Sequence, residues 1–233
     1  FQPGLTNHES PTMTIRWGIL GCGDVARRRV ATAIQQNAAS TLEAVCRRDQ
    51  EKLLSFRDDF NVPRGYTDAE QLLTDPEIDA LYIATPVYLH QQQAVTAAYQ
   101  GKHVLVEKPM AMSVAECDTM IEACEQNNVK LGVAYYRRFY PIIERIAEVI
   151  NSGEIGQPLS VTAVTATAFN FSPGDDGYWR VLMEQGGGGA LMDIGSHRID
   201  LFQHLFGPIS EVSGFTSTLA ADYQADNCTT LTM

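Results

Sequence analysis

The chain has 233 residues, of which 45% are hydrophobic, and its formal net charge at pH 7 is -11. A chain of this length and composition can bury a substantial core and can form one large domain or two small ones. The acidic balance argues against a nucleic-acid partner, because phosphate backbones are bound through clustered lysines and arginines.

The five cysteines are scattered along the chain without C-x-x-C spacing. The sequence therefore indicates neither a metal site nor a disulfide framework, and we expect a cytoplasmic protein. No apolar run approaches the roughly 20 residues that span a bilayer, so we expect no membrane partner. Residues 1–12 lack the pattern of a secretory signal. We expect a disordered or vector-derived leader there, with Met13 as the native start.

From residue 15 to residue 133, short apolar runs alternate with amphipathic stretches, which is typical of a parallel sheet with crossover helices. We predict strands at 16–20, 42–46, 80–84, 103–106 and 130–134, since each is rich in the apolar residues of a strand covered on both faces. Helices are predicted at 24–37, 49–60, 69–73, 89–100 and 113–127. These elements form a doubly wound α/β domain, to which we assign residues 13–135.

The pattern changes after Pro141. A helix over 142–150 is followed by a predicted strand over 159–171, which is rich in Thr and Val. A helix is then predicted over 191–206, with strands at 209–215 and from 228 onward. We expect residues 136–233 to be a partial α+β domain with an incomplete sheet, and the chain to be part of a longer protein.

A glycine-rich turn over 21–26 follows the first predicted strand directly and opens a helix. Gly21 permits the tight turn, and Gly23 lets the backbone approach a pyrophosphate. The helix begins at Asp24 and Val25, where its amide groups face the phosphates. The sequence therefore predicts a dinucleotide-binding turn, with a glycine turn that binds nothing as the alternative.

Arg47 and Arg48 follow the second predicted strand, where proteins with this turn read the cofactor's ribose. A guanidinium group suits the 2′-phosphate, so we predict NADP in preference to NAD. Asp49 is the competing residue, because a carboxylate there would accept from the 2′-hydroxyl. Its place before a predicted helix also suits a helix cap.

Two further strand ends carry candidate residues. Thr85 and Pro86 follow the strand at 80–84, at the edge where open α/β sheets bind ligands, and we predict cofactor contacts there. His90 follows in the next helix and either contacts the cofactor or is a capping or solvated residue.

Glu107 and Lys108 follow the strand at 103–106. We predict that both contact the cofactor and that Lys108 also bonds the reacting oxygen of a substrate. A surface lysine at a strand end is the alternative. The peptide bond between Lys108 and Pro109 is predicted to be cis.

Asp193 and His197 are four residues apart, so a helix places both on one face. We predict that Asp193 orients the substrate or the imidazole, while His197 exchanges the hydroxyl proton because histidine titrates near neutral pH. The glycines at 186–189 permit close approach of a ring-shaped ligand or form a flexible linker. Asp200 and His204 repeat the spacing, and we assign them a structural role.

Aromatic and basic residues flank these elements. Tyr135, Arg137 and Arg138 follow the last strand of the first domain and are candidates for substrate hydroxyls, with Arg137 also a predicted cofactor contact. Trp179 precedes the glycine run and either stacks on a sugar face, as a substrate contact, or packs a domain interface.

Together these motifs resemble the glucose-fructose oxidoreductase and inositol dehydrogenase family of two-domain NAD(P)-dependent sugar dehydrogenases. The resemblance covers residue 15 to the end and rests on the turn at 21–26, Thr85-Pro86 with His90, and three further motifs: Glu107-Lys108-Pro109, Arg137-Arg138-Phe139 and the D-x-G-x-H run from Asp193 to His197. It implies a Rossmann domain followed by an α+β domain with a large open, mainly antiparallel sheet. It also implies an active site lined by Lys108, Asp193 and His197.

Two positions depart from the family pattern: Val87 stands where asparagine is common, and Arg47 where aspartate is common. The first leaves the cofactor contacts of that loop open, and the second favours NADP. The resemblance implies hydride transfer between nicotinamide and a sugar, cyclitol or related polyol, in a homodimer or homotetramer when full length. A non-catalytic dinucleotide-binding regulator or ligand sensor of the same fold is the alternative.

Overall fold

The computed structural model describes residues 14–219 and 221–233. The predicted leader at 1–12 and the predicted start at Met13 lie outside the described residues. The chain divides into two compact units that alternate along the sequence. The first comprises the described residues up to Ala84 together with Gln93–Leu105 and Ala123–Leu131, and the second comprises Thr85–Gln92, Val106–Glu122 and Gly132–Met233. The domain boundary at residue 135 remains a prediction.

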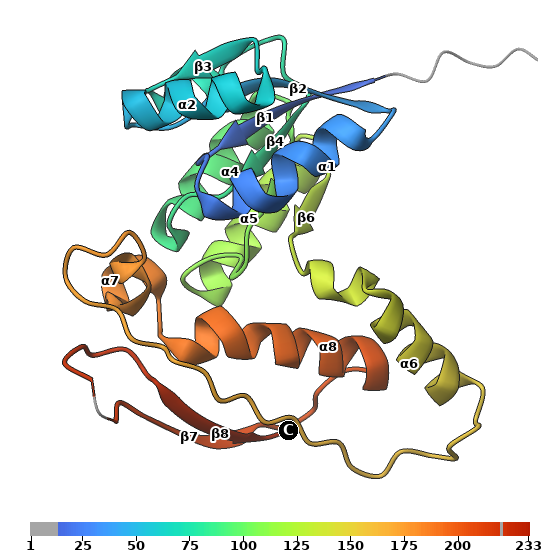
Figure 1. The fold of residues 1–233 in the computed structure, drawn as a ribbon. Helices are drawn as coiled ribbons and strands as arrows, with labels where there is room; N and C mark the ends of the chain where they lie inside the picture. The colour runs from blue at the N-terminus through green and yellow to red at the C-terminus, as the bar shows by residue number, and fades with distance from the viewer. Residues whose placement is uncertain (1–13, 220) are drawn as a thin grey trace, which may run out of the picture. The chain divides into compact units, whose positions relative to one another are not determined.

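Six strands form one sheet in the order β3-β2-β1-β4-β5-β6 (Figure 1). Their bounds are β1 Ile15–Leu20, β2 Ser40–Cys46, β3 Arg64–Tyr66, β4 Ala80–Ile83, β5 His103–Val106 and β6 Leu131–Val133. β1 pairs in parallel with β2 and β4, and β2 pairs in parallel with β3. All four residues of β4 are buried, as expected for a parallel strand covered on both faces. The predicted doubly wound α/β class is confirmed.

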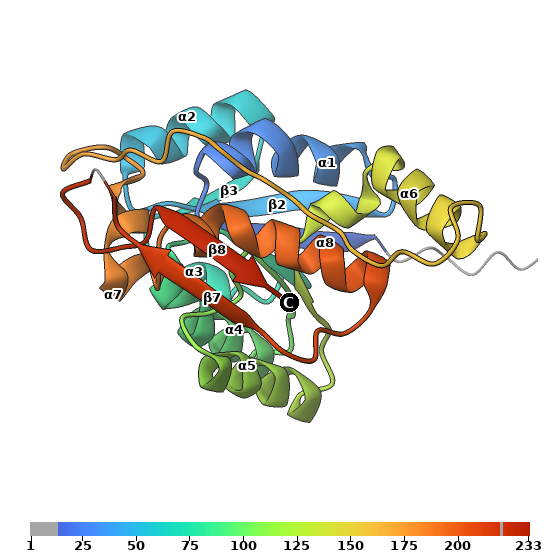
Figure 2. The same cartoon turned by 90° about the horizontal axis from the view of Figure 1, so that it is seen from below.

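Helices connect these strands. They are α1 Ala31–Gln36, which continues a π-helical segment over Ala26–Val30, then α2 Gln50–Phe60, α3 Ala69–Leu73, α4 His90–Tyr99 and α5 Val114–Gln126. Figure 2 shows α1 and α2 on one face of the sheet and α4 on the other. β3 has no counterpart among the predicted strands, because its three residues carry no apolar pattern. It forms by pairing with the end of β2.

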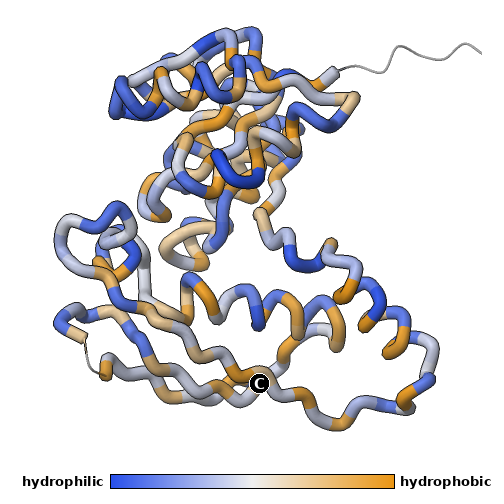
Figure 3. The backbone as a smooth tube through the Cα atoms, viewed as in Figure 1, coloured by the Kyte–Doolittle hydropathy of each residue, from blue (hydrophilic) through white to orange (hydrophobic). Residues whose placement is uncertain are grey.

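The second unit contains α6 Pro141–Asn151, α7 Met183–Gly186 and α8 Ser196–Phe206, which continues a π-helical segment over Leu191–Gly195. Figure 3 shows apolar residues at intervals along α6 and α8, as in amphipathic helices. An antiparallel pair of strands follows, β7 Ser213–Ser217 and β8 Cys228–Thr232. β7 begins four residues later than the strand predicted at 209–215.

The predicted strand over 159–171 is wrong. These residues form neither helix nor strand in the structure, and most of their side chains are exposed. Thr and Val favour strands because they pack well on a pleated, half-buried surface, and that preference is realised only beside a hydrogen-bonded neighbour. In the second unit as described, strand pairing beyond the first sheet is confined to β7 and β8. Composition alone therefore overstated the sheet.

Candidate functional site

The glycine turn follows β1 and is hydrogen-bonded to the end of the neighbouring strand β2. Gly21 has φ 97°, a left-handed conformation that favours glycine, and its N–H donates to the carbonyl of Cys46 at 3.0 Å. The N–H of Gly23 donates to the carbonyl of Gly21 at 2.8 Å. A Cβ atom added at Gly23 would meet no described atom within 4 Å. Packing therefore does not require this glycine, and the open space beside it suits a ligand.

The helix after the turn begins at Asp24 and Val25. The N–H of Arg27 closes the first turn by donating to the carbonyl of Gly23 at 3.0 Å. The carboxylate of Asp24 pairs with the guanidinium of Arg28 at 2.8 Å on the surface. The turn thus leads directly into a helix N-terminus, the arrangement that binds phosphates in dinucleotide-binding folds.

Arg47 reaches back to this turn. Its guanidinium donates to the carbonyl of Cys22 at 2.5 Å, and Arg48 is exposed. The Asp49 carboxylate accepts from the N–H of Lys52 at 3.0 Å, which confirms it as the N-terminal cap of α2 and lowers its pKa. The Asp49 carboxylate is thus engaged in the cap and the Arg47 guanidinium in the turn, and which of the two residues reads the ribose stays a prediction.

In the second unit, His90 bridges two loops that carry predicted site residues. Its Nε2 lies 2.9 Å from the carbonyl of Thr85, and its Nδ1 lies 3.1 Å from the carbonyl of Pro109. The side chain is 1% exposed, and this burial lowers its pKa against the opposing effect of the carbonyls. His90 is therefore not solvated, and its contact with a cofactor stays a prediction. The Lys108–Pro109 peptide bond is cis, as predicted.

Lys108 and Asp193 form the central pair of the candidate site. The Lys108 ammonium donates to Oδ1 of Asp193 at 2.6 Å and to its backbone carbonyl at 2.8 Å. The backbone N–H of Lys108 donates to the Glu107 carboxylate at 3.0 Å. Nε of Arg180 lies 3.8 Å from the other carboxylate oxygen of Asp193. Asp193 thus holds Lys108 directly, a pairing that its helical spacing to His197 did not predict.

His197 is 3% exposed, and its Nδ1 has no hydrogen-bond partner among the described residues. The rings of Tyr135 and Tyr136 meet it edge-on at 5.9 and 5.5 Å between centroids. Burial, together with the charges of Lys108 and Arg137, lowers the pKa of His197 to about 4. The imidazole is therefore neutral at pH 7 and does not titrate near neutrality, contrary to the premise taken from the sequence. Its role in proton exchange stays a prediction.

Arg138 is committed to a structural contact. Its guanidinium donates through Nε to both carboxylate oxygens of Asp200 at 2.8 and 2.9 Å, and a second nitrogen also pairs with that carboxylate. Asp200 is buried in α8, so the pair ties the segment after β6 to this helix. This supports the structural role assigned to Asp200, and it leaves Arg137 and Tyr135 as the candidates from this run.

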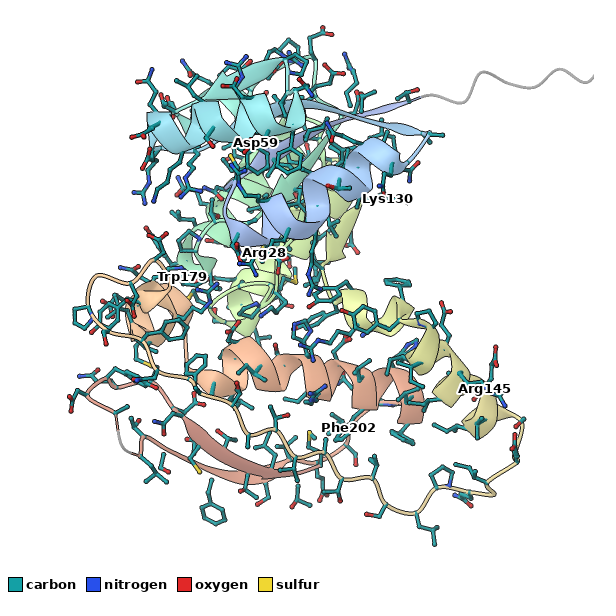
Figure 4. The ribbon with its side chains drawn as sticks, in the orientation of Figure 1. Arg28, Asp59, Lys130, Arg145, Trp179 and Phe202 are labelled. Atoms are coloured by element: carbon teal, nitrogen blue, oxygen red, sulfur yellow. The ribbon has the colours of Figure 1, made fainter. Side chains whose placement is uncertain are left out.

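Trp179 lies in a short 3-10 segment over Tyr178–Val181 (Figure 4). The guanidinium of Arg180 lies 4.6 Å from the Trp179 ring centroid and 5.9 Å from that of Phe171. Trp179 thus packs against the arginine that approaches Asp193. A stacking role on a sugar stays a prediction.

The glycine run is explained by the protein itself. A Cβ added at Gly186 would lie 2.8 Å from the carbonyl oxygen of Arg180, and one at Gly189 would lie 1.9 Å from that of Asp226. Gly186 and Gly189 thus admit neighbouring backbone, and the approach of a ligand to this run stays a prediction. Asp226 was not among the predicted residues, because it lies far along the chain and no motif marks it.

No group of three potential metal ligands occurs within residues 14–219 and 221–233. In that same part of the chain, no helix is long and apolar enough to cross a membrane.

Several relatives align with most of the chain. Oxidoreductase P35 of Formosa agariphila is 38% identical over 200 residues, 85% of this chain and 62% of that protein. The D-xylose 1-dehydrogenase (NADP(+)) 2 of Haloferax volcanii is 32% identical over 86% of this chain and 60% of its own length. The chain thus spans about three fifths of the length of these curated relatives.

Solved structures show the same fold. The WlbA dehydrogenase of Bordetella pertussis, in complex with NADH and UDP-GlcNAcA, is 31% identical with a TM-score of 0.81, over 93% of this chain and 64% of that one. The aldose-aldose oxidoreductase of Caulobacter crescentus, complexed with glycerol, is 30% identical with a TM-score of 0.82, over 94% and 66%.

Two protein-family models match successive parts of the chain. Residues 15–135 match the oxidoreductase family with an NAD-binding Rossmann fold, and residues 143–233 match the GFO/IDH/MocA C-terminal domain. The resemblance read from the motifs is thereby confirmed. The chain belongs to the GFO/IDH/MocA family of oxidoreductases.

Proposed function

We propose that this chain is the nucleotide-binding and catalytic part of an NAD(P)-dependent oxidoreductase. It moves a hydride between nicotinamide and a CH–OH carbon of a sugar, cyclitol or related polyol. The observation that carries the proposal is the Lys108 ammonium held on Asp193 at 2.6 Å, with its charge acting on a buried, neutral His197. Similar proteins named 1,5-anhydro-D-fructose reductase and D-xylose 1-dehydrogenase support this reaction class.

The turn residues fit a dinucleotide. The space beside Gly23 and the helix N-terminus at Asp24 and Val25 suit a pyrophosphate, and Arg47 beside the turn suits a 2′-phosphate. We propose further contacts from Thr85, Pro86, Glu107 and Arg137. The bound cofactor supplies the acceptor or donor of the hydride.

The chain's own residues stabilise the charge on the reacting oxygen and accept the hydroxyl proton. An ammonium has three N–H donors, and Lys108 uses two of them on Asp193. The third is left for the reacting oxygen, where it stabilises the negative charge that develops as the hydroxyl loses its proton. His197, neutral at pH 7, is in the form that accepts this proton. Tyr135 and Trp179 are proposed contacts for the rest of the substrate.

We propose NADP as the preferred cofactor. A first test is titration of the purified chain with NADPH and NADH, followed by nucleotide fluorescence. We expect tighter NADPH binding. We also expect Arg47→Ala to raise the Kd for NADPH by a factor of about 10 to 100, since a hydrogen bond to a charged group contributes about 1.5–3 kcal/mol. The Kd for NADH should change less than twofold. Exposed Arg48→Ala is the matched control.

Equal affinity for both nucleotides would overturn the NADP preference, and binding of neither would overturn the oxidoreductase itself. With binding established, turnover is tested on a panel of sugars and cyclitols with Lys108→Met as the control. Binding without turnover of any of them would favour the ligand sensor. A cytoplasmic location and a homodimer or homotetramer for the full-length protein are retained as predictions.

A further inference from the structure

Asp226 binds the start of the helical segment that carries Asp193 and His197. Its Oδ1 accepts from the N–H of Gly189 at 2.8 Å, and its Oδ2 accepts from the N–H of Leu191 at 2.8 Å. Its backbone carbonyl accepts from the N–H of Ala190, also at 2.8 Å. One residue thereby satisfies three consecutive N–H groups that lie 35 to 37 positions earlier in the chain.

These bonds supply acceptors to N–H groups at the start of a helix. The first N–H groups of a helix have no acceptor within the helix, and a carboxylate at that end also interacts favourably with the helix dipole. The approach is so close that a Cβ at Gly189 would lie 1.9 Å from the Asp226 carbonyl oxygen. Glycine at 189 and aspartate at 226 are therefore matched to each other.

The contact leads on to the candidate site through a short path of hydrogen bonds. Gly189, whose N–H is held by Asp226, accepts from the N–H of Asp193 at 3.0 Å. Asp193 in turn accepts twice from the Lys108 ammonium, at 2.6 and 2.8 Å. Every link from Asp226 to Lys108 is a hydrogen bond of 3.0 Å or less.

We propose that Asp226 is a positioning residue for the reaction: it fixes Asp193, and through it Lys108, without touching the substrate. The role in the reaction rests on the proposed function, whereas the effect on Lys108 is measurable without turnover. A purely structural reading would have Asp226 close the β7–β8 hairpin. However, its neighbour Asn227 has that role, since its side chain accepts from the Leu219 N–H at 2.7 Å and donates to the Leu219 carbonyl at 2.5 Å.

Asn227→Ala is therefore the matched control for Asp226→Asn. The first readout is the rate at which acetic anhydride acetylates Lys108 in the intact chain, measured by peptide mass spectrometry. Buried Lys102 and exposed Lys130 are internal references. Acetic anhydride reacts with an amine nitrogen that is free of other partners, and Asp193 engages the Lys108 nitrogen twice. We therefore expect Asp226→Asn to raise the Lys108 rate at least fivefold and Asn227→Ala to change it less than twofold. An unchanged rate in Asp226→Asn, or an equal rise in both variants, would overturn the proposal.

The second readout is steady-state kinetics. We expect Asp226→Asn to lower kcat at least tenfold while KM for the polyol and Kd for NADPH change less than threefold, because the nucleotide turn and the proposed contacts Tyr135 and Trp179 are not altered. Loss through KM alone would contradict a positioning role. If Asp226→Asn does not fold, Thr229→Val removes only the 3.3 Å bond to Oδ2 and should raise the acetylation rate about threefold, above the limit set for Asn227→Ala. Absence of NADPH binding by the unmutated chain would count against the proposed function alone.

Discussion

Two of the three N–H donors of Lys108 are committed to a single residue, the carboxylate and the backbone carbonyl of Asp193 at 2.6 and 2.8 Å. The side chains are 14% and 31% exposed, and a partly exposed ion pair contributes only about 0–1 kcal/mol to folding. Stability therefore gives little reason for the pair. Its geometry is better explained by the need to hold an ammonium in one place.

Lys108→Met should abolish most activity without unfolding the chain. Loss of a group that bonds the reacting oxygen typically lowers the rate about 10²–10⁴-fold. We expect kcat to fall by that factor, NADPH affinity to change less than threefold, and the unfolding free energy in urea to change by about 1 kcal/mol or less. Exposed Lys130→Met is the control. Activity above a tenth of the unmutated value in Lys108→Met would exclude the assigned role.

His197 should make the chain less stable as the pH falls. Its pKa is about 4 in the folded protein and about 6.5 when unfolded. Between these values the unfolded chain binds a proton that the folded chain does not, so stability is complete above about pH 6.5 and falls toward pH 4, by about 1.4 kcal/mol per pH unit at most.

Urea unfolding at pH 4.5, 5.5 and 7 tests this. The unfolding free energy of His197→Asn should vary less over this range than that of the unmutated chain. His204→Gln, on an exposed position of the same helix, is the matched control. Parallel pH profiles for His197→Asn and the unmutated chain would mean that the imidazole is not held neutral.

Gly23→Ala separates binding from folding. No described atom lies within 4 Å of the added methyl group, so the unfolding free energy should change by about 1 kcal/mol or less. The methyl group occupies the space proposed for the pyrophosphate, and we expect the Kd for NADPH to rise at least tenfold. Gly18→Ala should give the opposite result, since its methyl group would lie 2.8 Å from the Leu81 side chain. We expect the unfolding free energy to fall by about 1–3 kcal/mol. The folded fraction should bind NADPH with unchanged affinity. Unchanged nucleotide affinity in Gly23→Ala would place the cofactor elsewhere.

His90→Ala should destabilise the chain by about 2–4 kcal/mol, because it opens a cavity and removes the hydrogen bond that the neutral imidazole donates to one of the carbonyls of Thr85 and Pro109. An asparagine amide reaches the position of Nδ1 and a glutamine amide that of Nε2, so the variant whose amide replaces the donating nitrogen should recover part of the loss. Urea unfolding of the three variants measures this. His103→Asn, at a half-buried position, should cost less. Equal losses in His90→Ala, His90→Asn and His90→Gln would show that the hydrogen bonds do not matter.

Much of the first unit could be read from local patterns. The strands β1, β2, β4, β5 and β6 were predicted from their apolar residues, which are typical of the strands of a parallel sheet covered by helices. β3 could not be predicted in this way, since its three residues owe their conformation to pairing with β2. The prediction of a strand over residues 159–171 failed for the opposite reason. Their side chains favour strands, but a strand forms only where a neighbouring strand is hydrogen-bonded to it.

By itself the sequence determined the glycine turn after the first strand, offered a helix cap as one role of Asp49, and marked Lys108, Asp193 and His197 as candidate site residues, because turns, caps and motif spacings depend on neighbours a few residues away. Only the tertiary structure decided which partners these residues have. Asp193 bonds Lys108 across 85 positions, and Asp226 bonds Gly189 across 37. The neutral state of His197 likewise follows from burial and from charges brought near by folding. Such contacts join segments far apart in the chain, so no local pattern records them.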